Sequence, residues 1–253
     1  MIDMHCHLLP GIDDGAKDLD MSLELAKQAV EEGIHTVIVT PHHNNDRFWT
    51  PSEIVIPAVE QLQMRFIEAG ITLQILPGQE IHVNDAFFEA LDQGTFQTLG
   101  DSNYLLLEFP SISYPHNIDE IFHELKIKGY RVIIAHPERN RALWGQTNLL
   151  QDWVDQGVSL QVTSHSVSGL FGKKPQQEAL DWIEKGFVHL VASDAHHPKS
   201  RSLRMKDAFQ VIEQKYGKKV VDCLIKNGES LLLNESFVEL TADFFKKKRF
   251  LFW

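Results

Sequence analysis

The sequence predicts an α/β protein whose parallel strands close into a TIM-barrel-like barrel of seven strand–helix units. Short, nearly continuous apolar runs alternate with stretches of helical periodicity, a pattern typical of parallel strands buried on both faces. Most of these runs end on a histidine or a carboxylate, and catalytic groups of such barrels gather at the carboxyl ends of the strands. No linker or change in composition divides the 253 residues, so we expect one domain.

The expected elements follow one another in strict alternation. Strands are expected near Ile2–His7, Thr36–His42, Leu73–Glu80, Tyr104–Phe109, Arg131–His136, Ser159–Thr163 and Val188–Asp194. Helices are expected at Asp20–Glu32, Ser52–Ala69, Asn117–Lys128, Pro175–Lys185, Arg201–Tyr216 and Val220–Asn227. Four of these helices stop at a glycine, the residue that most often ends a helix. Residues 1–243 would form the barrel, and residues 244–253 a basic and aromatic tail.

Composition narrows the class of protein. The net charge of -11 argues against a general nucleic-acid binder, which usually carries a basic face. The two cysteines, Cys6 and Cys223, lie far apart in the sequence and predict no disulfide framework, so we expect a cytoplasmic location. The first residues lack the basic and apolar regions of a signal peptide, and no apolar run approaches the roughly 18 residues that a membrane span needs.

The first strand and the loop after it carry four candidate metal ligands. His5 and His7 are two residues apart, so on a strand both imidazoles point to the same face while Cys6 points to the other. Asp13 and Asp14 follow in the sequence GIDDG. Taken alone, this segment also reads as a turn. One of its carboxylates can bind a metal while the other caps or orients a neighbour.

Further candidate ligands close the later strands. Adjacent side chains on an extended segment diverge, so only one of His42 and His43 is expected to bind metal. Glu108 ends the apolar run LLLEF, where a buried carboxylate is costly unless it is paired or bound to metal. The remaining candidates are Glu80, His136, Asp194 and His196. Nitrogen and oxygen donors without a thiolate set suit manganese, iron or zinc.

Two arginines follow candidate ligands. Arg139 comes three residues after His136, and Arg201 comes five residues after His196. An arginine beside cations is expected where a phosphate must be held by two hydrogen bonds; the alternative is an ion pair with a nearby acid. A cysteine-dependent phosphatase is not expected, because neither cysteine is followed by the arginine-ended loop that cradles its thiolate.

These segments together resemble a known family. MIDMHCHLLPGIDDGA, TPHHN, LPGQEI, LLEFP, IIAHPERNR, GLFGK and VASDAHH occur in this order along essentially the whole chain. They are similar to the polymerase-and-histidinol-phosphatase (PHP) superfamily. Within it, they resemble the manganese-dependent protein-tyrosine phosphatases that accompany capsule and exopolysaccharide clusters in Gram-positive bacteria. Carboxylates at Asp14 and Glu108 favour this branch over the histidinol-phosphate phosphatases.

The resemblance implies a distorted seven-unit barrel of the PHP type with a trinuclear centre. His5, His7, Glu80 and Asp194 would hold the first metal; Glu80 would bridge to a second, completed by Glu108 and His136; Asp14, His42 and His196 would hold the third. Two or three cations, most simply manganese, would serve a direct hydrolysis in which a metal-bridging hydroxide attacks phosphorus. Arg139 and Arg201 would stabilise the transferring phosphoryl group. Asp14 is a candidate proton donor to the leaving group.

The same resemblance implies a protein substrate, the phosphotyrosine-containing tail of a cognate bacterial tyrosine kinase. The basic and aromatic segment FFKKKRFLFW at residues 244–253 predicts either a packed terminus or a contact with an anionic membrane surface. Three alternatives stay open: a small-molecule phosphatase such as one for histidinol phosphate, a non-catalytic regulatory barrel, and an amidohydrolase. The regulatory barrel would be expected to have gaps in its ligand set. The amidohydrolase would be expected to have a strand-end lysine.

Overall fold

A computed structural model describes residues 1–245 of the chain as alternating strands and helices. The strands are β1 (Ile2–Cys6), β2 (Thr36–Val39), β3 (His42–His43), β4 (Gln74–Pro77), β5 (Glu80–His82), β6 (Tyr104–Glu108), β7 (Arg131–Ala135), β8 (Ser159–Thr163) and β9 (Val188–Ala192). The helices are α1 (Leu19–Glu31), α2 (Ser52–Glu68), α3 (Phe87–Asp92), α4 (Ile118–Ile127), α5 (Thr147–Asp155), α6 (Ser164–Val167), α7 (Lys173–Glu184), α8 (Met205–Tyr216) and α9 (Lys218–Leu232), with 3-10 turns η1 (Pro137–Arg139) and η2 (Ala242–Phe244).

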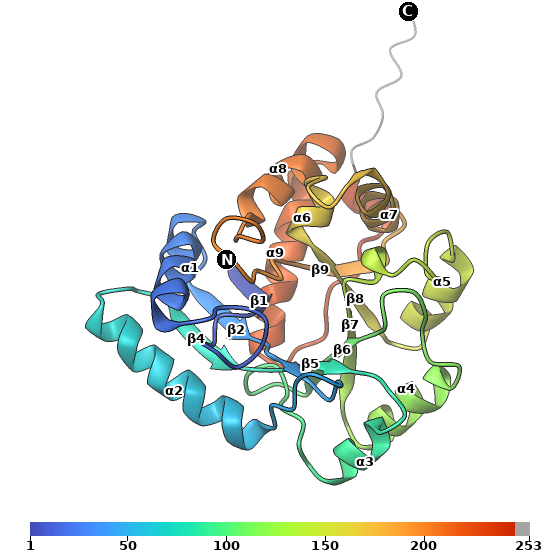
Figure 1. The fold of residues 1–253 in the computed structure, drawn as a ribbon. Coiled ribbons are helices and arrows are strands. Elements are labelled where there is room, and N and C mark those ends of the chain that lie inside the picture. The colour runs from blue at the N-terminus through green and yellow to red at the C-terminus, as the bar shows by residue number, and fades with distance from the viewer. Residues whose placement is uncertain (246–253) are drawn as a thin grey trace, which may run out of the picture.

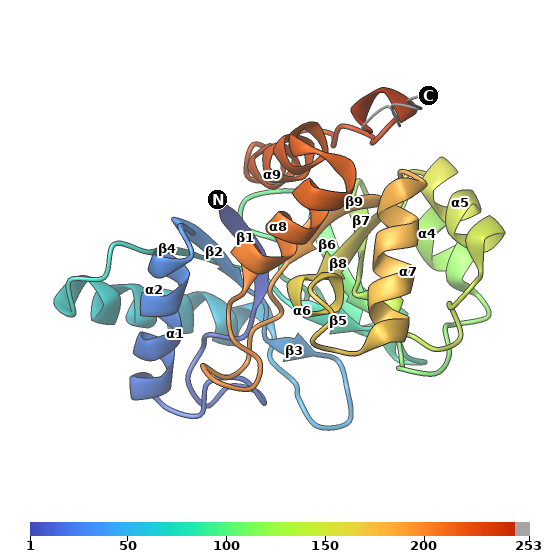
Figure 2. The same ribbon diagram turned by 90° about the horizontal axis from the view of Figure 1, so that it is seen from above.

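The strands are parallel and form two sheets that join into a distorted barrel. One sheet has the order β1-β2-β4 and the other β3-β5-β6-β7-β8-β9. Backbone hydrogen bonds from His7 N to Ala195 O and from Asp194 N to His5 O, both 2.9 Å, connect β1 to the end of β9. The strands occupy the centre and the helices surround them (Figures 1 and 2). The predicted α/β barrel of parallel strands is confirmed.

Two of the expected strands are each interrupted. Thr36–His42 divides into β2 and β3, and Leu73–Glu80 divides into β4 and β5. Pro41 has no N–H to give to a ladder. At Gly78, an added Cβ would lie 2.7 Å from Ile38 Cγ2, so the backbone there passes too close to its neighbour for a side chain. After these interruptions, β2 and β4 lie in one sheet and β3 and β5 in the other.

The helix predictions were wrong in number and in several boundaries, and α9 runs from Lys218 to Leu232 rather than over Val220–Asn227. The predicted set did not include α3, α5 or α6. Helices α3 and α6 have 6 and 4 residues, too few to show a helical period. Helix α5 is amphipathic, with Leu150 and Trp153 on its buried face, and its pattern could have been recognised. Helix α7 starts at Lys173 rather than Pro175, and α8 starts at Met205 rather than Arg201. The second difference has a local cause, because an isolated antiparallel bridge joins His197 to Arg201 and holds this segment in a loop.

The barrel interior is apolar below its polar end. Alternate residues of several strands form one buried cluster, which includes Met4, Ile38, Leu106, Ile133 and Leu190. A larger cluster fills the space between strands and helices. Layers of branched side chains are the usual filling of such barrels. This packing makes the polar residues at the carboxyl ends of the strands the floor of any site.

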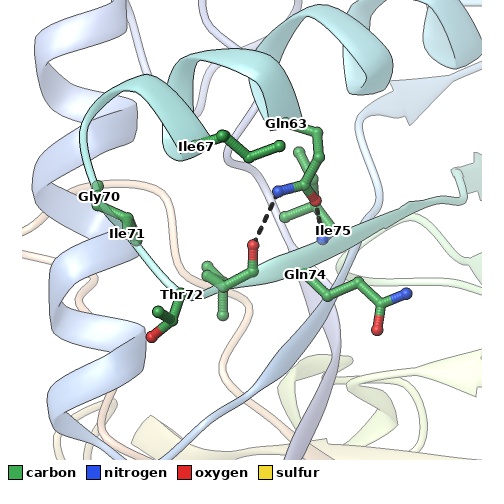
Figure 3. A pocket seen from close by; sticks show the side chains of 8 residues that line it. Gln63, Ile67, Gly70, Ile71, Thr72, Gln74 and Ile75 are labelled. Carbon is green, nitrogen blue, oxygen red and sulfur yellow. Dashed lines mark hydrogen bonds between the residues drawn. The ribbon is translucent and has the colours of Figure 1, made fainter.

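Strand β4 is protected along its outer side by a side chain of α2. Gln63 Nε2 donates to Leu73 O at 3.0 Å, and Ile75 N donates to Gln63 Oε1 at 2.8 Å (Figure 3). The amide thus takes the place of a neighbouring strand, which blunts an edge that could otherwise pair with another chain. The 640 Å³ cavity lined by these residues lies at the start of β4. It is therefore remote from the strand ends that carry the candidate ligands.

Two further sequence predictions concern the C-terminal tail and the absence of a membrane-spanning helix. Residues 246–253, which hold most of the predicted basic and aromatic tail, lie outside the described residues. Within residues 1–245, the helices are all too short or too polar to cross a membrane.

Candidate metal centre

The first strand presents two histidines to the barrel interior. The register of β1 against β2 shifts between Asp3 and Cys6, and such a shift re-aims side chains. Met4 therefore joins the interior apolar cluster while Cys6 joins the outer one. His5 and His7 are both buried, with their Nε2 atoms 3.2 Å apart. Two imidazole nitrogens converge on one region, as the sequence spacing predicts.

Glu80 lies at the centre of the cluster and is completely buried. Its Oε2 lies 3.3 Å from His5 Nε2 and 3.1 Å from His42 Nδ1, and its Oε1 lies 2.6 Å from His136 Nε2. Burial raises the pKa of Glu80, but the three imidazoles lower it more, so the pKa lies well below its usual value. The carboxylate is ionised and reaches three histidines with two oxygens, an arrangement suited to bridging cations.

Asp194 divides its two oxygens between the histidines and the arginines. Oδ1 lies 3.4 Å from both His5 Nε2 and His7 Nε2. Oδ2 is paired with Arg139 and, at 2.5 Å, with Arg201 Nη2. Burial raises the pKa of Asp194, but the histidines and arginines lower it by more than burial raises it. The pKa of Asp194 therefore also lies well below the usual range.

Asp13 orients a ligand. His7 Nδ1 lies 2.6 Å from Asp13 Oδ2, which leaves His7 Nε2 turned toward the cluster. The backbone N–H groups of Gly15 and His42 donate to the same carboxylate. A Cβ at Gly15 would lie 2.3 Å from His7 O, so only glycine permits this loop to close on β1. The sequence did not decide which of Asp13 and Asp14 orients a neighbour. In the structure Asp13 is the carboxylate that orients His7.

Asp14 joins two further histidines. Its Oδ1 lies 3.3 Å from His42 Nε2 and 3.4 Å from His196 Nε2. Hydrogen bonding from His196 and His42 lowers the pKa of Asp14. The side chain is 41% exposed, so this part of the cluster faces the solvent.

Glu108 lies beside His42, the first of the two adjacent histidines His42 and His43. Glu108 Oε2 lies 3.5 Å from His42 Nδ1 and 3.4 Å from His82 Nδ1. His43, which follows His42 in the chain, turns away from the cluster. Its Nδ1 accepts a hydrogen bond from Thr50 N at 3.1 Å, and burial lowers the pKa of His43 to about 4. Of the two adjacent histidines, one lies in the cluster and the other supports the loop, as their divergence predicts.

All nine predicted ligands lie in one contiguous cluster. Their donor atoms form three overlapping groups, each with atoms within 4.8 Å of one another: His7, Asp14, His42 and His196; His5, Glu80, His136 and Asp194; His42, Glu80 and Glu108. The resemblance instead placed His7 with the first metal and His136 with the second. In the structure His7 groups with the proposed third set and His136 with the first, and His42 also lies beside Glu80 and Glu108. His7 Nε2 still lies 3.4 Å from Glu80 Oε2 and from Asp194 Oδ1.

The donor atoms fit cations better than they fit one another. Four buried atoms of the cluster have no hydrogen-bond partner among the described residues: His42 Nδ1, Glu80 Oε2, Asp194 Oδ1 and His196 Nε2. Their nitrogen and oxygen neighbours are near, but the directions are unsuitable for hydrogen bonds. Buried polar groups are almost always satisfied in folded proteins. Lone pairs that converge without a donor are the expected signature of metal coordination.

Backbone strain is concentrated here. His136 has φ 33° and Asp194 has φ 52°, both in the left-handed region that non-glycine residues rarely adopt. Such strain persists where surrounding contacts enforce it, often at functional sites. His136 directly follows the last residue of β7, and Asp194 follows β9 after one intervening residue, Ser193. Both left-handed residues therefore lie at the carboxyl ends of strands.

Arg139 and Arg201 form the cationic side of the centre. Their side chains are 31% and 27% exposed, whereas their shared partner Asp194 is buried. The guanidinium groups therefore lie between the buried cluster and the solvent. Arg139 also stacks over the Phe171 ring, with its Cζ 5.2 Å from the centroid. The structure brings both predicted arginines to the cluster, in contact with an acid in each case.

A family model described as capsular polysaccharide synthesis, CpsB/CapC, matches residues 1–233. This chain belongs to the CpsB/CapC family. The tyrosine-protein phosphatase YwqE of Bacillus subtilis is 39% identical over 249 residues, which cover 98% of each chain.

Solved structures agree with this membership. A structure from work on YwqE of Bacillus subtilis and CpsB of Streptococcus pneumoniae, described there as metal-dependent tyrosine phosphatases, matches with a TM-score of 0.91 and 40% identity, covering 95% of this chain and 97% of the matched one. Histidinol phosphate phosphatase from Lactococcus lactis shares the fold, with a TM-score of 0.52 and 13% identity, covering 85% of this chain and 94% of the matched one. The resemblance to tyrosine phosphatases of capsule clusters is thereby confirmed.

The predicted ligand set of this CpsB/CapC protein omitted several supporting residues. Gln161 Oε1 lies 3.0 Å from His5 Nδ1 and fixes that ring. Asp3 accepts from Ser193 N at 2.9 Å and so ties β1 to the end of β9. His82 lies beside Glu108. Gln161 interrupts an apolar strand, and His82 follows Glu80 by two residues; both patterns could have pointed to the site.

Proposed function

We propose that this protein is a metal-dependent protein-tyrosine phosphatase that hydrolyses phosphotyrosine on a protein involved in capsule or exopolysaccharide synthesis. The observation that carries the proposal is the placement of two partly exposed arginines on a buried cluster of metal-type donors, through Asp194. Family membership and the description of YwqE as a tyrosine-protein phosphatase support it.

The proposed ligands are the nine predicted residues, with two or three divalent cations among them. Carboxylate and imidazole donors without thiolate suit manganese, and are also compatible with iron or zinc. Such cations lower the pKa of water and polarise phosphoryl oxygens when bound. Asp13 and Gln161 orient His7 and His5, and outer partners of this kind set ligand direction.

Within this proposal, the arginines hold the phosphoryl group. Arg139 and Arg201 each present a planar guanidinium that can donate two hydrogen bonds to phosphoryl oxygens. Their charge balances the charge that spreads over those oxygens during transfer. The lowered pKa of Asp14 keeps that carboxylate ionised, which supports a role as a ligand more than as a proton donor. A phenolate leaves with little help from an acid.

A cysteine nucleophile is disfavoured by both thiols. Cys6 and Cys223 are buried and unpaired, and burial raises the pKa of each. Thiols without a lowered pKa are poor nucleophiles. Two reduced, buried cysteines also support the proposed cytoplasmic location.

The proposed partner is the phosphotyrosine-containing tail of a tyrosine kinase. Contact of residues 244–253 with an anionic membrane surface is part of the same proposal, supported by the sequence of that segment alone. Liposome co-sedimentation of the full chain and of a chain ending at residue 243 tests it. Equal sedimentation of the two forms would contradict the contact.

The decisive test of function uses metal-stripped protein. Phosphotyrosine peptide, phosphoserine peptide and histidinol phosphate are each assayed before and after addition of manganese, iron or zinc. We expect activity only after metal addition, and highest on phosphotyrosine. Hydrolysis that is independent of metal, or a clear preference for histidinol phosphate, would overturn the proposal.

A further inference from the structure

A cavity of 540 Å³ lies next to the metal centre, between the segment after β5 and the segment after β6. We call it the β5–β6 groove. Its lining includes His82, Phe88, Pro110, Ser113, Tyr114 and His116. His82 belongs to both regions, because its Nδ1 lies 3.4 Å from Glu108 Oε2. The groove therefore begins where the centre ends.

The groove has an apolar floor and a polar rim. Phe88 and Tyr114 are partly buried against the main core, and the Tyr114 ring contacts the Trp153 ring edge-on at 5.7 Å. His116 and Asn117 are exposed on the rim. Their side chains form no hydrogen bond with any other residue of the 1–245 range, so they are available to a ligand. Neither lysine nor arginine is among the described residues that line the groove.

Both walls are fixed to the metal centre by hydrogen bonds. Asn140, which follows Arg139, donates from Nδ2 to Pro110 O at 3.0 Å and to Ser113 O at 2.7 Å. On the other wall, Asn44 Nδ2 donates to His82 O at 3.0 Å. A groove held in this way needs little ordering when a ligand binds.

We propose that the β5–β6 groove binds the polypeptide beside the phosphotyrosine and receives an apolar or aromatic side chain of a neighbouring substrate residue. The inference rests on the proposed phosphatase function. Consecutive Cα atoms of a peptide are 3.8 Å apart, so a chain that leaves the centre past His82 enters the groove at once. Pockets for organic groups have volumes of roughly 300–1,000 Å³, a range that includes this groove. A free aryl phosphate is held by the centre and leaves the groove empty.

The lining also indicates the character of the side chain. Phe88, Tyr114 and Pro110 offer apolar and aromatic contacts, which favour an aromatic partner. Asp85 lines the groove and Glu108 borders it. Without a lysine or arginine in the lining to oppose them, an acidic substrate residue is disfavoured.

The test fills the groove without touching the core. Ser113→Trp places a ring in the groove, while the bond from Asn140 goes to the Ser113 backbone and is retained. Ile112→Trp is the matched control, because Ile112 is the adjacent residue, is 70% exposed and does not line the groove. Phe88→Ala removes the floor as a second variant. All are compared with wild type in manganese.

The probes are a phosphotyrosine peptide flanked by glycines, four peptides with one phenylalanine at either of the two positions before or after the phosphotyrosine, and para-nitrophenyl phosphate. Fluorescence anisotropy measures peptide binding, and steady-state assays measure kcat and KM. At one position or more, phenylalanine should lower KM and Kd by about tenfold in the wild type. Ser113→Trp and Phe88→Ala should lose this preference, and Ile112→Trp should keep it. Hydrolysis of para-nitrophenyl phosphate should be equal in all four proteins.

The inference is overturned by a wild type that binds all five peptides equally, or by a Ser113→Trp variant that keeps the preference. A fall in para-nitrophenyl phosphate hydrolysis in Ser113→Trp would also contradict it, because the groove would then not be separate from the centre. Failure of the proposed function is a different result, in which metal-loaded wild type hydrolyses no phosphotyrosine substrate. Anisotropy still decides whether the groove binds peptide in that case.

Discussion

His7, one of the nine ligands, and Asp13, which is not among them, form a 2.6 Å contact between Nδ1 and Oδ2. The contact fixes which nitrogen of His7 faces the cluster. Burial lowers the pKa of His7, but Asp13 together with Asp194 and Glu80 raises it more, so the pKa lies well above its usual value. A carboxylate behind a ligating histidine both orients the ring and increases its basicity.

Asp13→Ala should therefore weaken metal binding by about 10–100-fold, the range for loss of an outer partner. Calorimetric titration of stripped protein with manganese measures the effect. Asp101→Ala, at an exposed turn, is the control and should bind as wild type. An unchanged manganese affinity in Asp13→Ala would show that the contact has no role in the site.

Substitution of His42 should reduce activity and metal binding, whereas substitution of His43 should reduce the stability of the fold. His42→Gln should abolish most activity and lower metal content, because its two nitrogens face Asp14 and Glu80. His43→Ala should retain metal, but it leaves the buried Thr50 N–H without its acceptor, which costs roughly 1–3 kcal/mol. Metal analysis and urea unfolding of both variants distinguish the two roles. The reverse pattern would mean that the assignments must be exchanged.

The candidate ligands at the strand ends could be predicted from the sequence, because each of them lies next to the apolar run of its own strand. Runs such as RVIIAH place an ionisable residue directly after a buried strand, and solvent exposure alone does not explain it. How the ligands group was not predictable, since it depends on the register shift in β1 and on the left-handed turns at His136 and Asp194. The interruption of Leu73–Glu80 depends on packing around Gly78. These features arise between elements, and periodicity within one element does not report them.

Arg139 should matter for catalysis and little for metal content. Arg139→Ala should lower kcat/KM on phosphotyrosine peptide by about 10²–10³, the usual effect of removing a donor that stabilises developing charge. Arg139→Lys should recover only part of the activity, because an ammonium cannot hold two oxygens in the planar geometry of a guanidinium. Arg141→Ala, in the same turn and exposed, is the matched control. Equal activity of Arg139→Ala and wild type would remove this residue from the mechanism.

His189 should make the protein sensitive to acid by a route separate from the metal centre. The residue is buried, and Leu160 N donates to its Nδ1 at 3.3 Å. Burial lowers the pKa of His189 from 6.5 to about 4. Between these two values the unfolded chain binds more protons than the native one, so stability is present above pH 6.5 and is lost as the pH falls toward 4. The loss at pH 5 relative to pH 7.5 is roughly 2 kcal/mol for this residue.

His189→Asn isolates that contribution, because its amide oxygen can accept from Leu160 N and does not titrate. Urea unfolding of stripped wild type and variant at pH 5 and 7.5 gives the comparison. The absence of metal removes the pH dependence of metal binding, and protonation of the candidate ligands themselves is common to both proteins and cancels in the difference. Wild type should lose roughly 2 kcal/mol more than the variant between the two pH values. Parallel losses in both proteins would mean that His189 is protonated in the native state, with an acid partner or water that offsets its burial.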